Sequence, residues 1–116
     1  RFSAVLSRQH CTMLDVGVHT KDLETLGRPL ARTLLIDDSN TSFILQPDNG
    51  VPIRPFYGDP EDRELVALLP QLRALVELAD VRPALRAKYQ MQQALRDRLD
   101  RARTQSGPIV CNERIE

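Results

Sequence analysis

The chain has 116 residues, which is enough for one small domain built around a single hydrophobic core. Hydrophobic residues make up 41% and charged residues 28% of the sequence, and these proportions are typical of folded globular proteins rather than disordered ones. Sixteen basic and sixteen acidic residues cancel, so we expect no direct nucleic-acid partner and no general attraction to anionic membranes.

The sequence also carries few signs of targeting or covalent cross-linking. No apolar run approaches the ~20 residues that cross a bilayer, so we expect no membrane span in this chain. It starts at Arg1 without an initiator methionine or a signal-peptide core, and we expect this start to be a cut in a longer polypeptide. Cys11 and Cys111 lie near opposite ends, and we expect both to be free thiols.

The first third of the chain predicts a strand, a helical turn and a second strand. Residues 4–13 lack helical periodicity and favour a strand followed by a loop. Residues 21–27 predict a short helical turn that ends at Gly27. The apolar run 33–36 then predicts a strand buried on both faces of a parallel sheet, and its abrupt end at Asp37 and Asp38 is the place to look for chemistry.

The middle of the chain predicts a turn, an edge strand and a helix. Residues 47–50 predict the turn, and 51–53 predict a short edge strand because Pro52 cannot donate to a ladder. Residues 59–62 predict the start of a helix, which Pro70 should bend or interrupt. The helix should lay one apolar face on the sheet, formed by Leu65, Leu68, Leu69, Leu72, Leu75 and Val76.

The last part of the chain predicts a charged helix over 80–104 and a flexible tail over 105–116. The predicted helix has seven basic and three acidic residues, so its net charge is +4 and that of the remainder is −4. We favour a solvated helix face, at about two to one, over a partner-binding helix or coiled coil, because no heptad pattern is sustained.

Two adjacent carboxylates, Asp37 and Asp38, give the sharpest local signal for chemistry. They repel each other unless a cation neutralises them, and a hard divalent ion such as Mg²⁺ is the natural candidate. The residues alone slightly favour the alternative, in which one aspartate caps the following turn and the other is merely exposed.

Lys21 is a second candidate, because it follows a loop and could direct its ammonium at a phosphate near the same sheet edge. The residues alone favour an ordinary surface lysine. His10 and His19 have no further histidine or cysteine at zinc-ligand spacing. The glycines are isolated, so no glycine-rich phosphate loop is present.

Three runs occur in an order and spacing that resemble a known family: 19–30 (HTKDLETLGRPL), 34–39 (LLIDDS) and 43–53 (FILQPDNGVPI). They resemble the C-terminal half of the NLI-interacting-factor-like domain of the haloacid dehalogenase superfamily. That domain is shared by RNA polymerase II C-terminal-domain phosphatases, Dullard-type phosphatases and the presequence-receptor subunit of the mitochondrial inner-membrane translocase. The resemblance covers roughly residues 5 to 90, and we assign residues 1–90 to the C-terminal half of a phosphatase-like domain.

The resemblance implies an α/β, Rossmann-like haloacid dehalogenase fold with a parallel central strand and flanking helices. It implies a Mg²⁺-dependent phosphoprotein serine/threonine phosphatase, acting on a phosphoprotein or phosphopeptide substrate. By the same resemblance Lys21 contacts the phosphoryl group, while Asp37 and Asp38 hold Mg²⁺, with Asp38 the favoured direct ligand. With the resemblance, we therefore favour functional roles for Lys21, Asp37 and Asp38, whereas the residues alone favoured structural or surface roles.

One departure from the family pattern concerns the nucleophile. The family's Asp-x-Asp-x-Thr/Val motif and its second-strand serine or threonine motif do not occur before Lys21, so this chain alone cannot form the family's aspartyl-phosphate. We therefore expect the remaining half of the domain, or a partner chain, to complete the sheet. The alternative is a noncatalytic interaction module or scaffold, such as a translocase or assembly subunit. Localisation stays open between nucleus, cytoplasm and mitochondrion.

Overall fold

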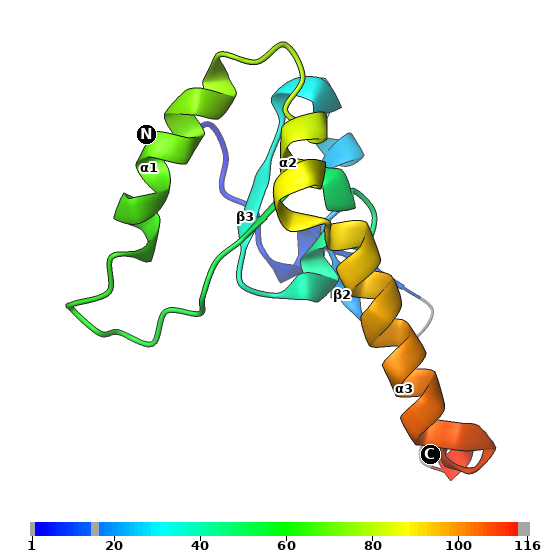
Figure 1. Ribbon diagram of the computed structural model, residues 1–116. Coiled ribbons are helices and arrows are strands. Elements are labelled where there is room, and N and C mark those ends of the chain that lie inside the picture. Colours follow the sequence, from blue (N-terminus) through cyan, green and yellow to red (C-terminus); the bar gives the residue numbers. More distant parts are fainter. Residues whose placement is uncertain (1, 15–16, 114–116) are drawn as a thin grey trace.

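A computed structural model of the chain describes residues 2–14 and 17–113, with side chains as far as residue 104. Three helices and four short strands are joined by 3₁₀ turns and loops (Figure 1). The strands are β1 (Thr12–Met13), β2 (His19–Thr20), β3 (Leu35–Asp37) and β4 (Gly50–Pro52), and the helices are α1 (Glu64–Val76), α2 (Arg82–Tyr89) and α3 (Met91–Glu113).

The strands form two separate pairs. β1 and β2 are antiparallel, with Thr12 opposite Thr20, whereas β3 and β4 are parallel, with Ile36 opposite Val51. Two parallel strands need a long connection, which here runs through the 3₁₀ turns η4 (Asn40–Phe43) and η5 (Pro47–Asn49). A mixed α/β chain with parallel strands, as the sequence predicts, is therefore confirmed.

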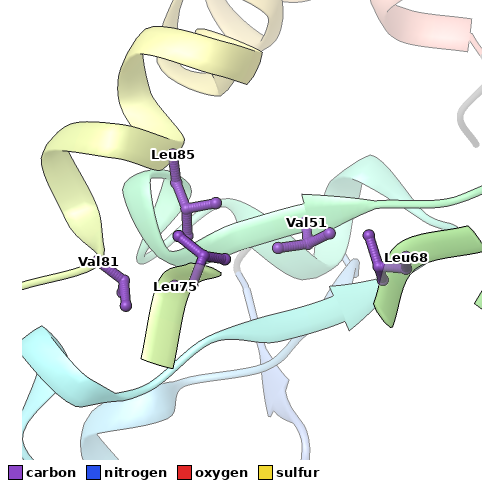
Figure 2. Close-up of a cluster of buried hydrophobic side chains, with 5 residues drawn as sticks. All are labelled: Val51, Leu68, Leu75, Val81 and Leu85. Atoms are coloured by element: carbon purple, nitrogen blue, oxygen red, sulfur yellow. The ribbon is translucent and has the colours of Figure 1, made fainter. Parts of the chain in front are cut away.

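The hydrophobic core lies where α1 and α2 cover the β3–β4 pair. Figure 2 shows its buried side chains, which converge from β4, from α1 and from the start of α2. They are Val51, Leu68, Leu75, Val81 and Leu85, and partly buried residues such as Leu34, Ile36 and Leu72 pack around them. This packing fixes β3, and with it the residue at its carboxyl end.

The strand β3 is less buried than the sequence predicts. Leu35, Ile36 and Asp37 are all half-buried rather than buried on both faces. The reason is that β3 pairs only with β4 among the described residues, and a sheet two strands wide is too narrow to shield a strand completely.

The first segment also differs from the predicted strand over 4–13. Residues Arg8–His10 form the 3₁₀ turn η1, and the strand β1 in this segment is confined to Thr12–Met13. The Ser7 amide donates to His10 Nδ1 at 2.9 Å, so a local side-chain bond competes with strand formation. By contrast, the turn predicted over 21–27 is present as η2 (Leu23–Leu26), and Gly27 ends it at φ 67°.

The helix α1 begins at Glu64 rather than within 59–62. Asp59 caps a preceding turn by accepting from the Glu61 amide, and it is Asp62 that accepts from the Glu64 amide. The helix continues through Pro70 without interruption. Of the six apolar residues expected on the sheet, Leu68 and Leu75 are buried and Leu72 is partly buried, whereas Leu65, Leu69 and Val76 are exposed.

The single helix predicted over 80–104 is wrong, because the structure has two helices there. Gln90 adopts a left-handed conformation with φ 48°, which ends α2 and separates it from α3. Asp80 lies just before the N-cap residue Val81 and accepts a hydrogen bond from the Arg82 amide at 3.0 Å. α3 then extends past the predicted end at residue 104 as far as Glu113, so 105–113 are helical rather than irregular. The predicted flexibility of 105–116 stays a prediction.

The molecule is elongated because α3 leads away from the rest of the chain (Figure 1). Its principal extents are 49 × 34 × 27 Å, and its radius of gyration is 16.4 Å. Among the residues searched, no helix has both the length and the apolar character needed to cross a membrane.

Candidate functional site

The structure brings two of the predicted site residues into direct contact. Lys21 directly follows β2, and Asp37 is the last residue of β3. Lys21 Nζ lies 2.5 Å from Asp37 Oδ2. The side chain of Asp37 is only 9% exposed, whereas that of Lys21 is 47% exposed. The ammonium is thus anchored on one side and open to solvent on the other.

A buried threonine holds Lys21 at this position. Thr20 Oγ1 donates to the carbonyl oxygen of Thr41 at 2.7 Å and approaches that of Ser42 at 3.2 Å. These bonds attach the end of β2 to the turn that follows β3. They fix the backbone next to Lys21, although the bonded residues are separated by 21 and 22 positions in the sequence.

A second set of bonds fixes the segment after Lys21. Gln46 Nε2 donates to Asp22 Oδ1 at 2.9 Å, and Gln46 Oε1 accepts from the Leu23 amide at 2.9 Å. Asp22 also accepts from the Glu24 amide, which caps η2. The residues before and after Lys21 are therefore both hydrogen-bonded to the connection between β3 and β4. These bonds fix the backbone position from which the Lys21 side chain extends.

The electrostatics of Asp37 favour the charged carboxylate. Partial burial raises the pKa of Asp37, but the hydrogen bond from Lys21 opposes this, aided by the Ser39 amide, the Ser42 hydroxyl and the positive charge of Lys21. The net result is a pKa below the ordinary value of 3.8. The Ser39 amide donates to Asp37 Oδ1 at 2.8 Å, so both carboxylate oxygens have partners.

Asp38, the third predicted residue, is placed differently. It is exposed at the bend after β3, and no described residue donates to its carboxylate. Within the residues searched, no three histidine, cysteine or acidic side chains are gathered closely enough to hold a metal. Mg²⁺ commonly takes one or two carboxylates and completes its shell with water and phosphate oxygens. Asp38 therefore fits one ligand position of a divalent cation rather than a complete cage.

A cavity of about 680 Å³ opens beside Lys21. Its lining includes cationic or titratable side chains from η1 and β2, namely Arg8, His10 and His19, together with Ser39 and Ser42 from the turn after β3. Among the described residues of this lining, Asp22 is the acidic one, and its Oδ1 accepts a hydrogen bond from Gln46. The cavity is suited to an anionic group.

The sequence reasoning missed several residues that build this site. Thr20, Ser39 and Ser42 carry no motif of their own, because their roles come from contacts across the fold. Arg8 lies in the first segment of the chain and reaches the cavity only through the η1 turn. Cys11 also lines the cavity, whereas the side chain of Cys111 lies outside the described residues.

Comparison with known families gives one match that covers most of the chain. Residues 1–82 match the family described as NLI interacting factor-like phosphatase. This range contains β1 to β4, the Lys21–Asp37 pair, Asp38 and α1. It ends at the first residue of α2, so α3 lies beyond the match.

Curated proteins with similar sequences include phosphatases and a translocase subunit. The chain is 42% identical over 90 residues to CTD small phosphatase-like protein 2 of Dictyostelium discoideum, which is 78% of this chain and 16% of that protein. It is 43% identical over 88 residues to mitochondrial import inner membrane translocase subunit TIM50 of Yarrowia lipolytica, covering 74% of this chain and 19% of that protein. It is 42% identical over 78 residues to CTD nuclear envelope phosphatase 1 of Xenopus tropicalis, covering 67% and 32%. The chain thus spans 16% to 32% of the length of these relatives.

Proposed function

Because this chain belongs to the NLI interacting factor-like phosphatase family, we propose that it supplies the charge-neutralising part of a Mg²⁺-dependent phosphoprotein serine/threonine phosphatase. The family is one of protein phosphatases, and its relatives include CTD phosphatases. In this proposal the chain is the C-terminal half of a Rossmann-like haloacid dehalogenase domain. The nucleophilic aspartate that would form the aspartyl-phosphate lies outside the chain, in the other half of the domain or a partner chain that completes the sheet.

The single observation that carries the proposal is the ion pair of Lys21 and Asp37 at the carboxyl end of a parallel strand. Ligands of α/β proteins characteristically bind at this end of a sheet. Lys21 keeps its open side toward the cavity, so its ammonium can receive a phosphoryl oxygen there. The transition state of phosphoryl transfer is loose and spreads negative charge over the phosphoryl oxygens, so a fixed cation contributes by offsetting that charge.

The two aspartates take different roles in this proposal. Asp37 has both carboxylate oxygens in bonds to Lys21 and Ser39, so it positions the lysine, although the sequence suggests it as a second metal ligand. Asp38 is exposed and supplies one carboxylate to Mg²⁺. The bound ion would polarise the phosphoryl oxygens and offset their charge.

The second candidate function is a noncatalytic interaction module or scaffold on the same fold. The observation that favours it is the 43% identity to a translocase subunit named for mitochondrial import. Lys21 and Asp37 would then be a structural ion pair with no phosphate ligand. The two functions differ in whether Lys21 is needed for phosphate recognition.

The test is turnover of a phosphoserine peptide, in the presence of Mg²⁺, by the chain together with the other half of the domain or the partner chain that carries the nucleophile. Changing Lys21→Met should lower kcat/KM by about 100-fold or more, because removal of one charge-stabilising donor typically costs this much. Lys88→Met is the matched control, since it removes an exposed lysine of α2 that does not line the cavity, and it should leave turnover unchanged.

Asp38→Asn should raise the Mg²⁺ concentration needed for half-maximal turnover in the same assay. Absence of turnover in the unaltered protein would favour the scaffold. Equal turnover in the unaltered protein and Lys21→Met would reject the role assigned to Lys21.

A further inference from the structure

A second hollow lies between α3 and the connection from β3 to β4, and we call it the α3 groove. Its cavity is about 470 Å³. Its apolar lining comes from two elements, with Ile44 and Pro47 on the connection and Leu95 and Leu99 on α3. Arg96 and Arg98 also line it. The α3 groove is partly built from residues beyond the family match, which ends at residue 82.

The apolar side chains of the α3 groove are accessible to a ligand. Leu99 is 53% exposed and Ile44 is 37% exposed. Met91, by contrast, is 5% exposed and anchors the first turn of α3 in the molecule. The helix is therefore fixed at its start, while farther along it offers apolar surface beside the connection.

The charge around the α3 groove is positive and largely uncompensated. Among the described side chains of α3, the ion pair found is between Arg103 and Asp100, and Asp97 accepts from Gln93. Arg96 approaches only the amide oxygen of Gln92, at 3.4 Å. In this described stretch, neither Arg96 nor Arg98 meets a carboxylate. A ligand with acidic groups beside apolar ones would complement both the arginines and the apolar side chains of the α3 groove.

The α3 groove and the cavity of the candidate site have Thr41 in common. This residue lines both the α3 groove and the larger cavity that contains Lys21. The two hollows thus flank the same turn after β3. A polypeptide with a phosphate at Lys21 could cross this turn and place a neighbouring stretch along α3.

We propose that the α3 groove docks an acidic segment with apolar side chains, belonging to the same phosphoprotein whose phosphoserine or phosphothreonine reaches Lys21. This assignment of a substrate class rests on the function proposed above. Apolar residues of the segment occupy the floor formed by Ile44 and Leu99, and its carboxylates meet Arg96 and Arg98. The concave, apolar floor does not suit a flat bilayer, and among the described lining residues no aromatic side chain is available to stack on nucleic-acid bases.

The experiment measures fluorescence anisotropy of a labelled, unphosphorylated peptide in which leucines alternate with pairs of glutamates. The unaltered chain should bind this peptide more tightly than a peptide with lysines in place of the glutamates, and added salt should weaken the binding. The double variant Arg96→Glu, Arg98→Glu should lower the affinity at least tenfold. Its matched control is Arg28→Glu, Arg73→Glu, which makes the same change of charge at exposed residues outside the α3 groove.

Three results would overturn the proposal. The first is equal affinity of the unaltered chain and the Arg96→Glu, Arg98→Glu variant for the acidic peptide. The second is sedimentation of the chain as a dimer that this variant abolishes, since the α3 groove would then hold a second copy. The third is binding of phosphatidylserine vesicles through Arg96 and Arg98 without binding of the peptide. Circular dichroism of each variant verifies folding, and the milder change Arg98→Gln should still weaken binding if the double variant unfolds.

A separate arm distinguishes failure of this proposal from failure of the proposed function. It uses a short phosphoserine peptide without acidic residues. Its binding should be lost in Lys21→Met and retained in the Arg96→Glu, Arg98→Glu variant. Failure of the unaltered chain to bind the phosphopeptide, while it still binds the acidic peptide, would reject the proposed function and the shared substrate, but would preserve the α3 groove as a docking surface.

Discussion

At the residue scale, Asp37 is the side chain that organises the candidate site. Its carboxylate joins the end of β3 to Lys21 through one oxygen and to the Ser39 amide through the other. A sequence cannot show which of two adjacent aspartates pairs with the lysine and which is exposed, because Asp37 and Asp38 differ only in the direction of their side chains. The strand turns Asp37 toward β2, while the following bend leaves Asp38 exposed.

The lowered pKa of Asp37 predicts a dependence of stability on pH. A carboxyl whose pKa is lower in the folded than in the unfolded chain stabilises the fold above its unfolded pKa, near 3.8, and loses this contribution as the pH falls through the folded value. Because Lys21 is half exposed, solvent screening keeps the contribution to about 0.5–1 kcal/mol. Urea unfolding of the unaltered chain and Asp37→Asn, in the presence of a chelator, should show this difference at pH 6 and a smaller one below pH 3.

Asp38→Asn provides the control for this measurement. Its carboxylate has no partner among the described residues, so its effect on the free energy of unfolding should change little across the same pH range. A constant difference between Asp37→Asn and the unaltered chain from pH 6 to pH 3 would contradict the assigned cause.

At the scale of the elements, the junction between α2 and α3 is the clearest departure from the sequence prediction. A glutamine at φ 48° is in a region that residues with a Cβ rarely adopt. Two buried side chains on either side of Gln90 explain this conformation, because α2 buries Leu85 and α3 buries Met91. A straight helix would carry Met91 and the charged residues after it in a different direction.

Gln90→Gly should therefore stabilise the chain. Glycine adopts positive φ without steric strain, which favours the folded chain, but it also has greater conformational freedom in the unfolded chain, which opposes folding. We expect a net increase of about 0.5–1 kcal/mol in the free energy of unfolding. Thermal unfolding followed by circular dichroism measures the change. Gln92→Gly, in the first turn of α3, should instead destabilise by up to about 1 kcal/mol, and a stabilising effect there would count against the explanation.

At the scale of the whole molecule, the chain is less compact than its length suggests. A compact chain of this size has a radius of gyration of about 13 Å, whereas the value here is 16.4 Å. The extension comes in part from α3, whose later turns project from the rest of the chain (Figure 1). Its first residue, however, belongs to the core, so a domain boundary directly after residue 90 would divide a packed unit.

Two truncations test where the folded unit ends. Deletion of 103–116 should change the free energy of unfolding by less than about 0.5 kcal/mol, because the side chains described at the start of this stretch are exposed. Deletion of 91–116 should cost at least about 2 kcal/mol, because it removes buried Met91. Urea unfolding measures both, and small-angle X-ray scattering should show a smaller radius of gyration for both. Equal stability of the two truncated chains would instead place the end of the folded unit at residue 90.

The sequence by itself determined the family and the local elements whose signals are short in range. The runs around Lys21, Asp37 and 47–50 were sufficient to predict an α/β chain with parallel strands, and Gly27 marked the end of a turn whose bonds lie within a few residues. The family followed because several runs share one order and spacing, which chance does not easily reproduce.

Only the tertiary structure decided which of these residues meet. Thr20 reaches the turn after β3, Gln46 holds the segment after Lys21, and Lys21 pairs with Asp37 rather than with Asp38. These contacts join residues 16 to 24 positions apart, and they depend on how β2, β3 and the intervening turns pack. The same holds for the break at Gln90 and for the α3 groove, because burial of Leu85 and Met91 overrides a local preference for one continuous helix.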